Sequence, residues 1–239
     1  MHPHQLTIPD TDSLEYARAR YHYLLQIEFG ETVAIDYCKT IADFAPSDES
    51  RKFLYQQQIE EERHLEMMTE YIGAHARPKV KISPYLKKMD EIMSDAINKK
   101  DYVECIFIQN FIVEGLNISL LRELEHHTDG VLSELVGKIL KDEMGHMQFG
   151  VDEIKKILDK NKSKKLVKKL IWLQRKTLFY ATGLAMQLGR EADNLGIPMG
   201  EFAKTVVSDH FDRIHKVKFP LPWIDSLAFK LVVVFLKMI

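Results

Sequence analysis

The sequence predicts an all-α protein, a four-helix bundle with additional C-terminal helices. Apolar residues recur at helical spacing along almost the whole chain, and the breaks fall where proline, glycine and Asp, Ser or Thr cluster. The chain of 239 residues is 46% hydrophobic and carries 12 Phe, 9 Tyr and 10 Met, which is enough to bury a full core. We therefore expect a flexible N-terminus over 1–12 and a single domain over 13–239.

The first long helix is predicted to begin after Thr11-Asp12-Ser13, with Asp12 as its N-cap and Glu15 reaching back, and to end near residue 44. Pro46 lies in the turn that separates it from the second helix. Later turns carry further proline, glycine, asparagine and serine residues. The other predicted helices span, in chain order, 49–74, 85–98, 101–126, 130–159, 164–194 and 200–217, and an apolar tail follows.

One pattern occurs twice on these helices, a glutamate followed about 30 residues later by Glu-x-x-His. The first copy is Glu31 with Glu61 and His64, and the second is Glu114 with Glu143 and His146. Residues three apart lie on one helix face, so the carboxylate and the imidazole can converge on one metal ion. A single Glu-x-x-His is weak, but the spacings of 30 and 29 residues repeat each other. Four carboxylates and two imidazoles on four helices form the ligand set of a di-iron bundle site.

The flanks of these residues support buried positions. Residues three, four and seven places from each glutamate are mainly apolar, for example Ile27 near Glu31 and Phe111 near Glu114. A carboxylate buried in an apolar stripe is costly unless it is paired, hydrogen-bonded or bound to a metal. Glu28 is a rival for the first ligand, but the spacing of Glu31 matches the second half of the chain.

Several polar residues near the pattern are candidates for contacts with the ligands. Asp142 precedes Glu143 and is a candidate for orienting a ligand histidine. Gln109, Asn110 and Asn117 lie near Glu114, where their amides either bond a ligand carboxylate or substrate, or satisfy each other. The remaining histidines without matching partners are predicted to be surface or cap residues: His22, His75, His126, His127, His210 and His215.

No global electrostatic field favours nucleic acid or an anionic membrane as a partner, because 33 basic residues stand against 35 acidic ones. Partners must therefore be argued from local features. Eight lysines over 155–169 are read as a solvated loop rather than a docking site for a carrier, lipid or RNA. Cys38 and Cys105 are too few for a disulfide framework or a four-cysteine iron centre, which indicates a reducing, cytoplasmic setting. The polar N-terminus does not resemble a signal peptide, and we find no apolar run of membrane-spanning length.

The apolar tail over 227–239 is too short to span a bilayer. We expect it to cap the bundle. The alternative is that the tail forms an exposed apolar surface for peripheral contact with a membrane or a protein partner.

A carboxylate-rich site with two nitrogens favours two iron ions, with manganese as the alternative, over zinc with thiolates. Open coordination positions between two metals suit O2 as co-substrate, activated to the peroxide level. Apolar walls would exclude water and shape a tunnel for a small hydrophobic substrate.

The chain resembles the cyanobacterial aldehyde-deformylating oxygenases of the ferritin-like superfamily over most of its length. The likeness is carried by Gly30-Glu31, Ala42-Asp43-Phe44-Ala45-Pro46, Glu61-Glu62-Arg63-His64, the stretch from Cys105 to Glu114, Lys141-Asp142-Glu143-Met144-Gly145-His146 and, more weakly, Leu195-Gly196-Ile197. The resemblance implies a ferritin-like di-iron enzyme that uses O2 and electrons from an external reductase or ferredoxin. It would cleave a fatty aldehyde into an alkane and formate, with the six residues above as metal ligands.

This chain departs from that family around the metal site. Leu121, Leu124 and Met144 stand where the family has tyrosines, and the C-terminal tail differs. The alternatives are therefore a di-iron hydroxylase or N-oxygenase of a small or carrier-bound metabolite, for which Asn110 and Asn117 would suit a polar substrate. Two further alternative functions are that of an iron-handling or peroxidase protein and that of an RNA-modifying enzyme.

Overall fold

The computed structural model describes residues 13–75, 79–128 and 130–236. The described chain forms helices and connections with no strand, which confirms the all-α prediction. Ten helical segments follow in order: α1 Leu14–Asp43, α2 Asp48–Gly73, α3 Pro84–Asn98, α4 Tyr102–Ile106, η1 Phe107–Val113, α5 Glu114–His127, α6 Gly130–Lys160, α7 Lys164–Asn194, α8 Met199–Lys216 and α9 Trp223–Leu236. The division into a flexible 1–12 and a single domain stays a prediction, since 1–12 lies outside the described residues.

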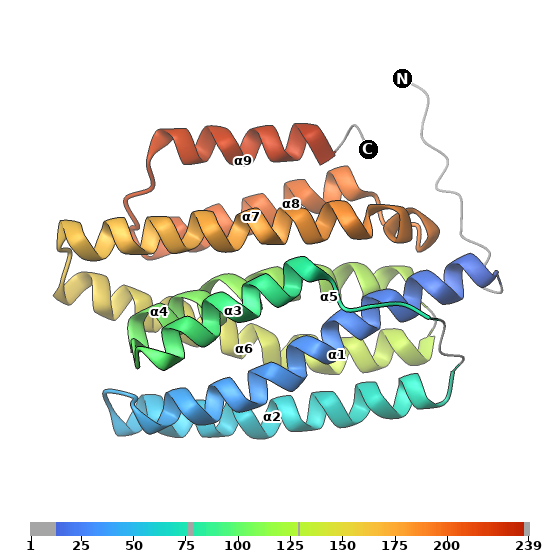
Figure 1. The fold of residues 1–239 in the computed structure, drawn as a ribbon, viewed down its shortest axis with the longest axis horizontal. Coiled ribbons are helices and arrows are strands. Elements are labelled where there is room, and N and C mark those ends of the chain that lie inside the picture. The colour runs from blue at the N-terminus through green and yellow to red at the C-terminus, as the bar shows by residue number, and fades with distance from the viewer. Residues whose placement is uncertain (1–12, 76–78, 129, 237–239) are drawn as a thin grey trace.

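Four long helical rods form the bundle: α1, α2, α6 and the continuous rod of α4, η1 and α5. α1 packs along α2 and α5 packs along α6, while α2 and η1 also contact α6. The added helices cover another side of this bundle, because α7 packs on α1 and α3, and α8 packs on α5. Figure 1 shows α9 as the outermost helix, separated from the bundle by α7 and α8.

The structure differs from the sequence-based expectations at both ends of the described chain. Ser13, not Asp12, is the N-cap of α1, and its hydroxyl accepts the Tyr16 N–H at 3.0 Å. Serine at this position reaches the third helical residue, which is the usual capping geometry. Residues 227–236 of the apolar tail, for which the sequence pattern predicts no separate helix, belong to the regular helix α9, Trp223–Leu236. Residues 237–239 lie outside the described part of the chain.

The rod formed by α4, η1 and α5 contains a π-helical segment that the sequence did not predict. This segment is η1, and it ends directly before Glu114. The Glu114 N–H donates to the Gln109 carbonyl, five residues back, instead of the usual four. Such wide turns are rare and occur often at functional sites. Here the segment passes very close to α6, where Gly150 faces the backbone of Asn110.

The core consists of two apolar clusters, and the predicted metal ligands lie between them. One cluster contains Leu54, Ile112 and Val151, and the other contains Met68 and Leu121. In α2, Glu61 and His64 lie between Leu54 and Met68, and the other three rods change cluster at the corresponding level. The ligand layer is therefore closed by apolar side chains on both sides along the bundle.

One helical stretch in the described part of the chain, Tyr102–His127, is long and apolar enough to cross a membrane by length and composition alone. Within the fold, 72% of its apolar window is buried. Buried core helices of a bundle pass the same test, and this stretch is the central rod of the bundle.

Gly150→Ala tests the close contact between α6 and η1. A Cβ at this position would lie 2.6 Å from the backbone carbon of Asn110, and backbone cannot move aside cheaply. We expect a loss of about 1–3 kcal/mol in the free energy of unfolding, measured by urea denaturation. Gly189→Ala is the matched control, because no atom lies within 4 Å of its Cβ; the usual helical gain of about 0.5–1 kcal/mol is expected there. Equal effects of the two changes would contradict the close contact.

Candidate metal centre

The six residues of the duplicated pattern come together in one buried layer. Glu31 projects from α1, Glu61 and His64 from α2, Glu114 from the start of α5, and Glu143 and His146 from α6. None is more than 3% exposed. The rival Glu28 lies outside this layer, where it is partly exposed and accepts a hydrogen bond from Thr69.

The six side chains form two overlapping sets of possible ligands. One set is Glu31, Glu61, His64 and Glu143, and the other is Glu61, Glu114, Glu143 and His146. Within each set the candidate ligand atoms lie within 4.8 Å of one another. Glu61 and Glu143 belong to both sets, so their two carboxylates can bridge a pair of metal ions. The sequence pattern supplied the six residues but did not indicate which two are shared.

Both imidazoles direct Nδ1 into the cluster. His64 Nδ1 lies 3.3 Å from Glu31 and 3.4 Å from Glu61, and His146 Nδ1 lies 3.3 Å from Glu61 and 3.2 Å from Glu143. The two rings therefore face the shared carboxylates from opposite ends of the layer.

The outer nitrogens of the two imidazoles each face a further carboxylate. His64 Nε2 lies 3.2 Å from Asp142, and His146 Nε2 lies 2.8 Å from Glu60. The arrangement is reciprocal, since the acidic residue that precedes the ligand glutamate of one motif contacts the histidine of the other. A carboxylate on the outer nitrogen fixes the ring and its tautomer, leaving the inner nitrogen free to bind metal.

These two outer carboxylates are themselves held. Arg63 donates to Asp142 at 2.5 Å, and Gln56 donates to Glu60 at 2.9 Å. Asp142 was a candidate for such a contact from the sequence, whereas Glu60 was not singled out. The symmetry of the two motifs was the signal, because both have an acidic residue directly before the ligand glutamate.

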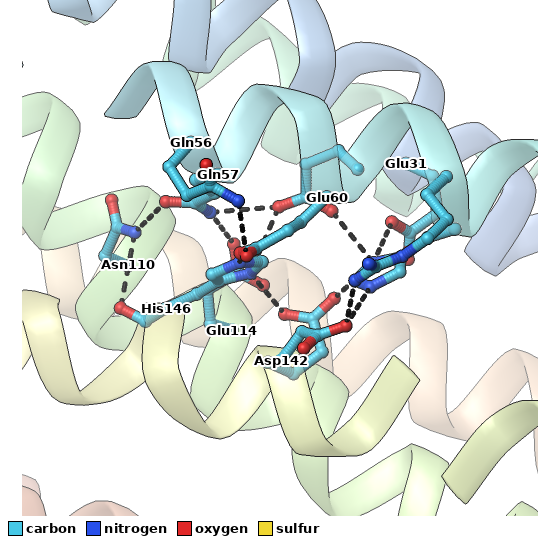
Figure 2. A network of polar contacts seen from close by, with 12 residues as sticks. Glu31, Gln56, Gln57, Glu60, Asn110, Glu114, Asp142 and His146 are labelled. Carbon is cyan, nitrogen blue, oxygen red and sulfur yellow. Dashed lines mark hydrogen bonds and ion pairs between the residues drawn. The ribbon is translucent and has the colours of Figure 1, made fainter. Parts of the chain in front are cut away.

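An amide network supports the carboxylates on the other side, as Figure 2 shows. Gln57 Nε2 donates to Glu61 at 2.9 Å and to Glu114 at 3.0 Å, and Asn110 donates to the Gln57 carbonyl oxygen at 2.7 Å. Gln109 also donates to Glu114, at 2.9 Å. The π-helical turn brings Gln109 and Glu114 together, because residues five apart share a face only in that geometry.

The three amides predicted near Glu114 thus differ in their contacts. Gln109 bonds a cluster carboxylate, while Asn110 reaches the cluster only through Gln57 and also donates to the His146 carbonyl at 3.4 Å. Asn117 is half-buried and lines the adjoining cavity. Gln57 was missed from the sequence, although it lies one helical turn before Glu61 on the same face.

Burial and repulsion distort the acid–base properties of the cluster. Burial raises the pKa of Glu31 and of Glu114 well above the ordinary value, and repulsion by Glu61 and Glu143 adds to the rise. Burial acts in the same direction on Glu143, but its contacts with both histidines outweigh burial and lower its pKa. The neighbouring carboxylates raise the pKa of His64 and His146 against the effect of burial. The layer therefore attracts positive charge strongly.

The donor set fits a pair of metal ions. Glu31 Oε2, His64 Nδ1 and Glu143 Oε1 are buried and have no hydrogen-bond partner among the described residues. Buried polar atoms are normally satisfied. His64 Nδ1 lies 3.3 Å from Glu31 Oε2 and 3.5 Å from Glu143 Oε1, so the three atoms are close enough together to share one cation. Carboxylate oxygens and imidazole nitrogens, with no thiolate among the described ligands, match the preferences of iron and manganese.

A cavity of about 230 Å³ adjoins the cluster and reaches Glu31, Glu61, Glu114 and Glu143. Its walls come from α1, α3, η1, α5, α7, α8 and α9, and most of them are apolar. The apolar wall residues come from the bundle and from the outer helices, and include Val113, Leu120, Ala185, Val206, Phe229 and Val232. The cavity therefore offers an apolar path from the added helices to the carboxylates.

His210 is a further residue that the sequence reading misplaced. It was predicted on the surface, but it is 2% exposed and lines the cavity. Its Nε2 lies 3.3 Å from the Gln174 oxygen, and its Nδ1 accepts from Arg213 at 3.4 Å. Its helical neighbours Val206, Val207 and Ile214 form an apolar stripe, which was the available signal. His22, also expected on the surface, is likewise buried.

The fold and the buried carboxylate–histidine layer define a helical bundle protein with a candidate metal site. A sequence profile of the family described as "Ferritin-like domain, actinomycetes" matches residues 15–201. The chain belongs to this ferritin-like family, which confirms the ferritin-like part of the resemblance seen in the sequence.

Among solved structures, the fold is similar to that of a protein from Synechococcus described as "Protein 19 with aldehyde deformylating oxidase activity". The TM-score is 0.76 at 15% identity, and the match covers 93% of this chain and 99% of that one. At this identity the likeness establishes the shared fold. No curated protein sequence matches the chain.

The buried His210 predicts a specific acid sensitivity. Burial, together with the charge of Arg213, lowers the pKa of His210 to about 3. In the unfolded chain a histidine titrates near pH 6.5. From pH 6.5 down to about 3 the unfolded state holds the extra proton, so stability falls by up to about 1.4 kcal/mol per pH unit.

The test compares free energies of unfolding by urea at pH 7.0 and pH 5.5. We expect the wild type to lose about 1–1.5 kcal/mol more than His210→Gln over this interval. His215→Gln, a change at an exposed position of the same helix, is the matched control and should follow the wild type. Identical pH dependence in the wild type and His210→Gln would contradict a neutral buried imidazole.

Proposed function

We propose that this protein is a di-iron oxygenase acting on a hydrophobic substrate, most specifically a fatty aldehyde that it converts to an alkane and formate. The observation that carries the proposal is the pair of overlapping ligand sets at the inner end of an apolar cavity. The cytoplasm is the setting that we propose for it.

In this proposal Glu31 and His64 would hold one metal, Glu114 and His146 would hold the other, and Glu61 and Glu143 would contribute to both. Asp142 and Glu60 hold the rings of His64 and His146 from behind. When bound, a pair of ferrous ions would supply electrons for the reduction of O2, and manganese is the alternative metal.

The protein's own residues would then bind and orient the substrate. An alkyl chain fits the apolar walls, and its reactive end would lie beside the carboxylates that form the inner end of the cavity. Gln109 and Asn117 line the same region and can donate a hydrogen bond to a carbonyl oxygen. The packed walls keep water from the reacting group. Exclusion of water strengthens the electrostatic interactions in the site and prevents side reactions with water.

The reaction balance requires outside electrons. Aldehyde, O2, electrons and protons give alkane, formate and water, so the aldehyde C–C bond breaks while O2 is reduced. The two cysteines, Cys38 and Cys105, are buried and lie on different helices, so we do not assign the supply of electrons to them. We propose instead that a separate reductase or ferredoxin supplies the electrons. The aldehyde deformylating activity of the Synechococcus protein supports an aldehyde as the substrate class.

Hydroxylation or N-oxygenation of a small or carrier-bound metabolite is the second candidate. The amides of Gln109 and Asn117 in the cavity wall favour it, because they could bind a polar group. The mainly apolar cavity argues against a protein that only stores iron or removes peroxide, since neither role needs an organic binding site.

The shared carboxylates predict unequal effects of ligand substitutions on metal binding. We expect two ferrous ions per wild-type chain under anaerobic titration, about one in Glu31→Gln, Glu114→Gln or His146→Ala, and none bound stoichiometrically in Glu143→Ala. Circular dichroism should show retained helix content in each. The exposed Glu62→Gln, next to Glu61, is the matched control and should bind two. Full stoichiometry in Glu143→Ala would exclude this centre.

Measurement of catalytic turnover with different compounds tests the proposed substrate class. The iron-loaded protein, given O2 and a reductant, should release formate from long-chain aldehydes and leave amines and alkanes unchanged. Ala185→Phe narrows the cavity wall and should shift the preferred aldehyde to a shorter chain, whereas Ala74→Phe, at an exposed helix end, should not. Oxidation of amines or alkanes without formate would establish the second candidate instead.

A further inference from the structure

The outermost helix, α9, is apolar on two opposite faces. Its inner face contributes Phe229 and Val232 to the cavity wall, and Phe229 also packs against His210 and Phe211. Its outer face carries large apolar side chains that no described residue covers. A helix with apolar side chains on two opposite faces is normally covered on both, so the outer face of α9 is suited to contact with a further partner.

The exposed side chains of α9 form one stripe. Residues 223, 227, 231 and 234 repeat at helical spacing, with Ile224 beside them. The exposed fractions are 76% for Trp223, 52% for Ile224, 47% for Leu227, 59% for Leu231 and 56% for Val234. This concentration of exposed apolar surface on one short helix exceeds the scattered single residues that a soluble surface normally shows.

Helix α7 extends the stripe. Arg175 of α7 binds Asp225 of α9 through two contacts, at 2.7 and 3.1 Å. Trp172 and Phe179 lie three residues before and four residues after Arg175, and therefore share its helix face. They are 56% and 68% exposed. We call Trp172, Phe179 and the five exposed residues of α9 the α7–α9 face.

Two features of this face match an anionic lipid surface. Both tryptophans of the chain lie on it, and tryptophan is enriched where protein meets the lipid headgroups. Lys216 ends α8, Lys218 lies in the connection to α9, and Lys230 lies on α9. All three lysines are exposed, and none has an ion-pair partner among the described residues. Apolar side chains flanked by lysine are the composition of helices that lie in a membrane interface.

A second copy of the chain fits this face less well. A twofold contact brings the same patch of both copies together, which would place the lysine-rich rims near each other. Anionic headgroups would instead neutralise these lysines. The position of α9 adds a reason for lipid, because α9 contributes Phe229 and Val232 to the wall of the apolar cavity while its opposite face is exposed.

We propose that the α7–α9 face binds the surface of an anionic lipid bilayer, so that the apolar cavity lies against the membrane. Trp172, Trp223 and Leu227 enter the interface, and the lysines contact headgroup phosphates. The proposal does not depend on metal or on turnover, and its test uses metal-free full-length protein.

The experiment adds vesicles of phosphatidylcholine, with or without about one third of anionic phosphatidylglycerol, and follows tryptophan fluorescence and co-sedimentation. Since both tryptophans are on the proposed face, binding should shift their emission to shorter wavelength, more with the anionic vesicles and less at high salt. Leu227→Asp with Leu231→Asp should reduce binding at least about tenfold. Lys216→Gln with Lys230→Gln should weaken binding to anionic vesicles only.

The matched control is Ile59→Asp with Val131→Asp, at positions that are 58% and 69% exposed on α2 and α6. This variant should bind vesicles like the wild type. The proposal is overturned if the wild type binds neither vesicle, if both aspartate variants lose binding equally, or if the wild type is a dimer that only the α9 variant dissociates. Circular dichroism and unfolding curves exclude loss of fold as the cause.

Discussion

The structure depends on the burial of four carboxylates and two imidazoles in one water-free layer. Such a layer is stable only if opposite charge or hydrogen bonds balance it. Here the histidines face the shared carboxylates Glu61 and Glu143, and amides satisfy Glu114. The orphan atoms that remain point inward, toward the place that a pair of metal ions would take. The buried carboxylates and imidazoles need hydrogen-bond partners, and the surrounding Gln57, Gln109, Asp142 and Glu60 provide them.

The four bundle rods and the added helices have different tasks. The rods supply every ligand and hold each one between two apolar clusters, so that the helix backbones fix the geometry. Helices α7, α8 and α9 supply much of the cavity wall that leads to the ligands. Variation in these outer helices can therefore change what reaches the carboxylate–histidine layer without disturbing the layer itself. Because the outer helices form much of the cavity wall, membership of the ferritin-like family does not identify the substrate of this chain.

Much of the fold was predictable because helical periodicity and turn residues are local signals. The predicted helix 164–194 matches α7, and most other boundaries differ by one or two residues. The errors arose where a competing interaction decides. Ser13 rather than Asp12 caps α1 because of its position relative to Tyr16. The turn of η1 depends on the approach of Asn110 to Gly150 on another helix, which no local pattern reveals.

By itself the sequence determined the helices and the six residues that meet in the buried carboxylate–histidine layer, because residues three apart on a helix must share a face. Only the tertiary structure decided that Glu61 and Glu143 belong to both ligand sets, that Glu60 and Asp142 cross over to the opposite histidines, and that His210 is buried beside a cavity. These relations join residues of different helices. They depend on the rotation and depth of each rod in the bundle, which are set by packing between helices rather than by the sequence of any one of them.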